Sequence, residues 1–271
     1  MIAMAACVYS HTSAQQLTTP QPSPTQTVKQ NFSTGSIELS YSRPSKKGRA
    51  VFGDLVPYGK VWRTGANAAT TLTFADDVTI GGKEVKAGKY GLLSIPNEKK
   101  WTLIITKDVT VTSPAAYKEE NDVVRLEADA MKMPYNIETF SITFGEITGS
   151  SINLQLMWDN VFLQFPITTN TEARVMKQIE EVMNKDNKPY FSAAQYYYDN
   201  GKDLGQALTW ANKAIDNNKE AFWIYMLKAR ILAKQGNKAE AKAAATTVVD
   251  LATKAKNDDY VKMGNDLIKT L

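Results

Sequence analysis

The segment from Tyr41 to Phe74 carries the residues of this chain that are best suited to bind a ligand. Between residues 43 and 63 a single acid, Asp54, faces six basic residues, namely Arg43, Lys46, Lys47, Arg49, Lys60 and Arg63. Arginine binds carboxylates and phosphates through two parallel hydrogen bonds, and glycines let backbone N–H groups approach a ligand closely. Aromatic residues in the segment offer flat walls for a sugar ring or another apolar face. The segment therefore predicts an anion or glycan site.

Eight residues of this segment are candidates for ligand binding: Tyr41, Arg43, Lys46, Arg49, Tyr58, Trp62, Arg63 and Asn67. Asn67 could orient a polar group through its amide, although asparagine after small residues is also a common turn former. The same residues allow a purely structural interpretation. In that case Arg43 and Arg63 pair with buried carboxylates or brace loop carbonyls, and Lys46 is a solvated turn residue. The sequence leaves both interpretations open.

Much familiar catalytic chemistry lacks its essential residues. The only histidine, His11, and the only cysteine, Cys7, both precede Ala14, where we expect a signal peptide to be cleaved. The mature chain would then have no Ser-His-Asp triad, no Cys-His nucleophile, no thiolate or imidazole zinc site and no disulfide. What remains is carboxylate, lysine, tyrosine or arginine chemistry, or no catalysis.

The acidic residues show no spacing that is typical of a metal or catalytic site. Asp76 and Asp77 are adjacent, so on a strand their side chains would point to opposite faces. Two carboxylates at the separation used by glycosidases cannot be recognised in a single sequence. We therefore expect no metal and no cofactor, while hydrolytic chemistry stays open.

Residues 1–14 resemble the end of a secretory signal peptide, because they are apolar and small and suit cleavage after Ala14. The basic start of such a peptide is missing, so under this interpretation the sequence begins inside a longer signal. One alternative treats Met4 to Cys7 as a loose lipobox with a lipid anchor on Cys7, and another treats the segment as a disordered cytoplasmic tail. Residues 15–31, polar and rich in proline, predict a disordered tether.

The 271 residues suffice for two domains, and the pattern changes near residue 168. Residues 32–167 have the pattern of strands and turns, and residues 168–271 that of helices. The net charge of +4 is too small to predict nucleic-acid binding, which needs a concentrated basic face. No mature stretch reaches the roughly twenty apolar residues of a membrane span.

The first domain is predicted to be an antiparallel β-sandwich or flattened barrel, with an α+β fold class for the whole chain. Alternating apolar and polar residues predict strands at 37–41, 71–74, 101–105, 123–128, 139–144, 152–158 and 161–167. Asp159 and Asn160 are predicted to form a two-residue hairpin turn between the last two strands. A parallel sheet would need crossover helices, for which the spacing leaves no room.

The second domain is predicted to be all-α, with its first helix beginning at the capping-box spacing of Thr169 to Glu172. A spacing of thirty-four residues relates Phe191, Tyr198, Ala207 and Ala214 to Tyr225, Leu232, Ala241 and Val248. This is the tetratricopeptide period, and turns are expected at Asn200-Gly201 and Gln235-Gly236. Residues 258–271 would cap such an array. A plain helical bundle is the alternative.

The run SRPSKKGRAVFGDLVPYGKVWRTGANAAT closely resembles the core of the domain of unknown function 2911 family. The resemblance continues through the glycines at 81, 82 and 88, through Ser94-Ile95-Pro96 and Trp101, and ends near Trp158 and Ile167. It covers roughly residues 35–167. It implies a secreted, β-rich bacterial domain that is often followed by a helical repeat, and it supplies no substrate and no catalytic residue.

Three classes of function follow from these patterns. We expect a secreted or periplasmic binding or assembly protein, with an arginine and aromatic pocket for an anion or glycan and a helical tail for an unknown protein partner. A periplasmic hydrolase or lyase that uses tyrosine or carboxylate chemistry on an anionic or glycan substrate is the alternative. A purely structural envelope protein is the third class, and a lipid-anchored envelope protein is the alternative to a secreted or periplasmic location.

Overall fold

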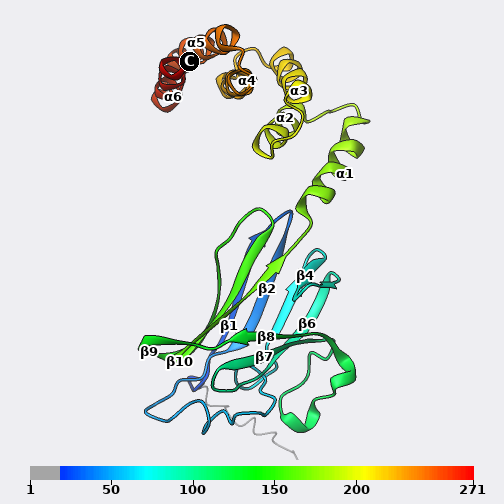
Figure 1. The fold of residues 1–271 in the computed structure, drawn as a ribbon, viewed down its shortest axis with the longest axis vertical. Helices are drawn as coiled ribbons and strands as arrows, with labels where there is room; N and C mark the ends of the chain where they lie inside the picture. Colours follow the sequence, from blue (N-terminus) through cyan, green and yellow to red (C-terminus); the bar gives the residue numbers. More distant parts are fainter. Residues whose placement is uncertain (1–18) are drawn as a thin grey trace, which may run out of the picture. The chain divides into compact units, whose positions relative to one another are not determined.

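The computed structural model describes residues 19–271 of the chain (Figure 1). The predicted cleavage site, Cys7 and His11 lie outside the described residues. The chain divides into two compact units between Thr171 and Glu172. The first unit consists of antiparallel sheets and the second of helices, which confirms the α+β class.

The described residues of the first unit, 19–171, form two antiparallel sheets. The larger one has the order β1 (Thr25–Phe32), β2 (Gly35–Ser42), β3 (Thr71–Phe74), β6 (Gly88–Ile95), β7 (Lys100–Thr106) and β8 (Asp122–Asp129). The smaller one has the order β5 (Lys83–Val85), β4 (Val78–Ile80), β10 (Ser151–Thr168) and β9 (Met131–Gly145). Two 3-10 turns, Pro114–Ala116 and Glu119–Asn121, lie between β7 and β8.

Both sheets bury one face in a shared hydrophobic core. In β2 the buried residues Ile37, Leu39 and Tyr41 alternate with more exposed ones, and β10 repeats the pattern from Ile152 to Trp158. Because side chains point to opposite faces of a strand in turn, this alternation fixes which face of each strand packs inward. One core cluster draws its members from both sheets, which corresponds to the sandwich alternative.

The N-terminal boundary of the β unit differs from the prediction. Residues 25–31 were expected to belong to a disordered tether, but Thr25–Phe32 forms β1 and pairs with β2 along its whole length. The strand was missed because it is polar and only its last residue, Phe32, is buried. An edge strand tolerates such a sequence, since it needs only one hydrogen-bonded neighbour.

The predicted hairpin at Asp159 and Asn160 is wrong. Ser151–Thr168 is a single strand of 18 residues, and its register with β9 shifts on both sides of Asp159. Asp159 has a φ of 51°, a left-handed conformation that aspartate tolerates better than most residues. The turn signal therefore marks a β-bulge, which kinks the strand without reversing it.

The second unit contains six helices, α1 (Thr171–Met183), α2 (Tyr190–Asp199), α3 (Leu204–Asn217), α4 (Phe222–Lys234), α5 (Lys238–Lys254) and α6 (Asp258–Thr270). From α2 to α6 each helix packs on the next. Gly201 and Gly236, with φ of 63° and 83°, occupy the predicted turns after α2 and α4. Ala207 and Ala241 are fully buried. No helix in the described part of the chain is long and apolar enough to cross a membrane.

Gly91, in the centre of the larger sheet, should not tolerate a side chain. A Cβ there would lie 2.5 Å from the carbonyl oxygen of Asp108 and 2.9 Å from Cγ2 of Thr106. We expect Gly91→Ala to lower the free energy of unfolding by about 1–3 kcal/mol, as overpacked sites do. Gly149→Ala, where a Cβ meets nothing within 4 Å, should change it by less than about 0.5 kcal/mol. Urea unfolding followed by tryptophan fluorescence measures both, and equal midpoints would contradict the prediction.

Candidate functional site

The segment between β2 and β3 lies across one end of the two sheets (Figure 1). Backbone hydrogen bonds fix it there at three points. Lys46 N–H donates to the carbonyl of Glu138, Gly59 N–H donates to that of Pro96, and Trp62 exchanges two hydrogen bonds with Ser94. The residues predicted to bind a ligand are therefore carried on loops whose path is set by the sheets beneath them.

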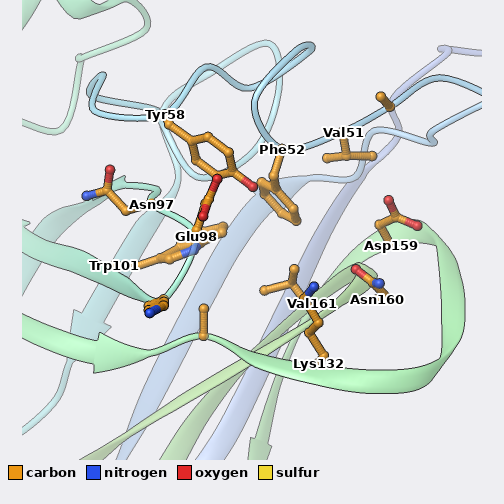
Figure 2. Close-up of a pocket in the computed structure, with 13 residues that line it drawn as sticks. Val51, Phe52, Tyr58, Asn97, Glu98, Trp101, Lys132, Asp159, Asn160 and Val161 are labelled. Atoms are coloured by element: carbon orange, nitrogen blue, oxygen red, sulfur yellow. The ribbon is translucent and has the colours of Figure 1, made fainter.

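An open cavity of about 450 Å³ lies at this end of the β unit, and we call it the end cavity. Its apolar surface comes from Val51, Phe52, Trp101, Val161 and small neighbours, and its polar surface from Tyr58, Asn97, Glu98, Lys99, Lys132, Asp159 and Asn160. Figure 2 shows Tyr58, Asn97, Glu98 and Trp101 on one side and Asp159, Asn160 and Lys132 on the other. The cavity thus combines charged and amide groups with the exposed ring of Tyr58 and the partly exposed ring of Phe52, beneath which lies the buried Trp101.

The apolar floor of the end cavity rests on a cluster of aromatic rings. Phe52 meets Trp101 edge to face, with ring centroids 4.8 Å apart. Behind them Trp62 stacks on Trp158 at 6.0 Å, and Phe140 lies 5.0 Å from Trp62. Rings in such mutual contact have few alternative rotamers, so the floor is held rigid.

Tyr58 stands at the rim of the end cavity with 39% of its surface exposed. Gly53, with φ of 92°, allows the ring to lie against the backbone, because a Cβ at Gly53 would come within 2.9 Å of Cε2 of Tyr58. Leu55 and Val56 close this tight loop through hydrogen bonds to Ala50 and Val51. Position 53 therefore has to be glycine for the ring of Tyr58 to lie where it does.

One ion pair joins the predicted segment to the wall of the end cavity. Nζ of Lys46 lies 2.5 Å from Oδ1 of Asp159, and the two side chains are 18% and 22% exposed. The bulge in β10 turns Asp159 toward this lysine. Among the described residues, no ion pair engages the other charges at the cavity, Glu98, Lys99 and Lys132. Those three groups stay available to a ligand.

Three of the predicted residues brace the fold through their polar groups. Arg43 donates from Nε to the carbonyl of Phe140 and from Nη2 to Oγ of Ser141. Arg49 donates to the carbonyls of Lys46 and Ser45, which closes its own turn. Asn67, at φ 55°, donates its amide to the carbonyl of Ser23. These contacts fit the structural interpretation of Arg43, Arg49 and Asn67.

Tyr41 is buried between the sheets and is committed to internal hydrogen bonds. Its hydroxyl accepts from the N–H of Ile142 at 2.8 Å and donates to Oε1 of Gln26 at 3.1 Å. Burial raises the pKa of the Tyr41 phenol above its usual value, because the interior disfavours the phenolate. Tyr41 is therefore a neutral hydroxyl at physiological pH.

The eight predicted residues do not share one cavity. Tyr58 lines the end cavity, and Lys46 reaches it through Asp159. Tyr41 and Arg43 line a second cavity of about 360 Å³. Trp62 and Arg63 line a third, of about 280 Å³. The single arginine and aromatic pocket expected from the sequence is divided among three places.

Most polar residues of the end cavity were not among the predicted ones. Glu98, Lys99 and Lys132 were assigned to no site, and Asp159 and Asn160 to a hairpin turn. The only feature of the sequence that could have pointed to these residues is their position as polar residues at the ends of predicted strands. A sequence does not show which strand ends meet in space, so this signal could not be converted into a site.

The geometry describes a β-rich unit with an open, aromatic-floored cavity at one end. Residues 23–167, a little more than half of the chain, match the family described as protein of unknown function (DUF2911), and the chain belongs to this family. No curated protein and no solved structure matches the chain. The family expected from the sequence is confirmed, and its description names no activity.

We predict that Lys46 stabilises the fold through Asp159, whereas the adjacent Lys47 does not. Lys46→Met removes the cation and leaves a largely buried carboxylate without its partner, which should cost about 1–2 kcal/mol. Lys47→Met, at an exposed position, should change stability by less than about 0.5 kcal/mol. Urea unfolding distinguishes the two, and equal effects would show that the pair contributes nothing.

Proposed function

We propose that the β unit is a binding module that holds a polar ligand with a flat face, such as a sugar ring, in the end cavity. The observation that carries this proposal is the combination of an aromatic floor with three charged groups, Glu98, Lys99 and Lys132, that form no ion pair among the described residues. Aromatic faces pack against the apolar face of a sugar ring, while carboxylates and amides bind its hydroxyl groups. A site of this kind needs neither metal nor cofactor.

The charges at the rim favour a ligand that carries some negative charge. Lys99 and Lys132 have no ion-pair partner among residues 19–271, and Asp159 is already paired with Lys46. Of the two carboxylates that line the cavity, Glu98 forms no ion pair with any residue that the structure describes. Two lysines against one free carboxylate fit a sugar acid better than a basic ligand.

The helical unit is proposed to bind a protein partner. Helix pairs joined by glycine turns, with buried Ala207 and Ala241 at equivalent places, support a tetratricopeptide-like array. Such arrays bind extended peptides along one face. The whole protein would then be a secreted or periplasmic binding or assembly protein, with a lipid anchor at Cys7 as the alternative to free release.

Replacement of Tyr58 tests the proposed glycan site. With a panel of neutral and uronic-acid oligosaccharides, titration calorimetry should find binding that Tyr58→Ala weakens about three- to tenfold, the usual worth of one aromatic contact. Tyr135→Ala is the matched control, because Tyr135 is 60% exposed and lines none of the three cavities. If the two variants bind alike, or if no oligosaccharide binds, the end cavity is not a glycan site.

A hydrolase or lyase is the second candidate, since Glu98 and Asp159 line the same cavity as Tyr58. Under this alternative one carboxyl group donates a proton while the other group or Tyr58 acts as base or nucleophile. Glu98→Gln should then abolish cleavage of the oligosaccharide that binds best, with its affinity changed less than about threefold. Reducing-end release over time is the measurement. If the wild-type protein binds the oligosaccharide without cleaving it, the hydrolase or lyase alternative is rejected and the binding module remains.

A further inference from the structure

The third cavity, beside Arg63, has the composition of a site for an organic anion. Its walls include two cations, Lys60 and Arg63, and no acidic residue. Neither cation forms an ion pair with any residue in the part of the chain that the structure describes. Leu55, which is 39% exposed, and Pro57, Val61 and Pro114 supply apolar surface next to these charges.

The guanidinium of Arg63 is fixed on one side and uncommitted on the other. Nη1 donates to the carbonyl of Thr112 at 2.5 Å, which orients the plane of the group. Nε is buried and has no hydrogen-bond partner within residues 19–271. In arginine the N–H bonds of Nε and Nη2 point in parallel, on the side opposite Nη1. The free side of Arg63 is thus the fork that binds a carboxylate through two oxygens.

A buried donor without an acceptor is unfavourable, and native proteins rarely leave one unexplained. Arg43 is an instructive contrast, because its Nε and Nη2 both have acceptors inside the protein. The missing acceptor at Arg63 is therefore specific to this position. An external anion is one group that would supply it.

We propose that Arg63 and Lys60 bind the carboxylate of a small amphipathic ligand whose apolar part lies on Leu55, Pro57 and Val61. Nε and Nη2 of Arg63 hold the two carboxylate oxygens, and Lys60 adds a second positive charge. Because Nε is covered from solvent, the carboxylate reaches it only after the side chain of Arg63 or the wall around it shifts. This site shares no lining residue with the end cavity, so carboxylate binding here can be tested independently of the proposed glycan binding.

Arginine side-chain NMR tests the proposal directly. In ¹⁵N-labelled protein, sodium hexanoate should shift the Nε–H resonance of Arg63 in a saturable manner and leave that of Arg43 unchanged. Hexanamide, which has the same apolar chain without the charge, should bind at least about tenfold more weakly. Inorganic phosphate, which lacks the apolar part, should also bind more weakly than hexanoate.

Two pairs of variants complete the test. Arg63→Lys keeps the charge but removes the planar fork, so hexanoate should bind at least about tenfold more weakly. If Arg63→Lys does not fold, Leu55→Glu offers a second route, since it places a negative charge in the wall at an exposed position. Leu55→Glu should weaken hexanoate binding more than its neutral match Leu55→Gln does.

Three results would overturn the proposal. Equal binding of hexanoate and hexanamide would mean that only an apolar groove is present. Phosphate binding as tight as that of hexanoate would mean that the site selects anions without regard to their apolar part. The absence of a saturable shift at Arg63 with hexanoate would mean that its Nε is satisfied by water.

Discussion

The contact between Trp62 and Trp158 is the constraint on which the rest of the β unit depends. Trp62 comes from the segment between β2 and β3 and Trp158 from β10, and their stacked rings join that segment to the core. Phe52, Trp101 and Phe140 pack around the pair. The path of the loops, the floor of the end cavity and the position of Arg63 next to Trp62 all follow from this packing.

Many polar side chains near this cluster serve the backbone. A long loop that crosses the end of two sheets leaves carbonyl groups that no strand satisfies, and these need donors. Arg49 donates two hydrogen bonds to carbonyls of this loop, whereas Arg43 donates two to β9, one to the carbonyl of Phe140 and one to the hydroxyl of Ser141. Thr64 is held in a left-handed conformation, unusual for a β-branched residue, by contacts to Ser94 and Thr70. The many arginines and glycines of this loop therefore meet its need for hydrogen-bond donors and for unusual backbone conformations as much as they suit any ligand.

The sequence predicted features that depend on local patterns and missed those that depend on distant contacts. Strands such as Thr71–Phe74 and the glycine turns of the helical unit follow from alternation and turn chemistry. The polar edge strand β1 has no such pattern, and the bulge at Asp159 has the same residues as a turn. The end cavity joins residues 50–58, 97–101, 130–132 and 159–161, which only the tertiary fold brings together.

The near-parallel rings of Trp62 and Trp158 also have an optical consequence. At 6.0 Å the two indole rings are close enough for their electronic transitions to couple, and Trp101 lies within 6.2 Å of Trp62, so the coupled tryptophans are expected to contribute to the circular dichroism of the folded chain. That contribution depends on the mutual orientation of the rings, so it changes when Trp62 moves away from its neighbours. Since Trp62 belongs to the segment between β2 and β3 and Trp158 to β10, circular dichroism can report, without any added label, whether that segment is packed on the sheet.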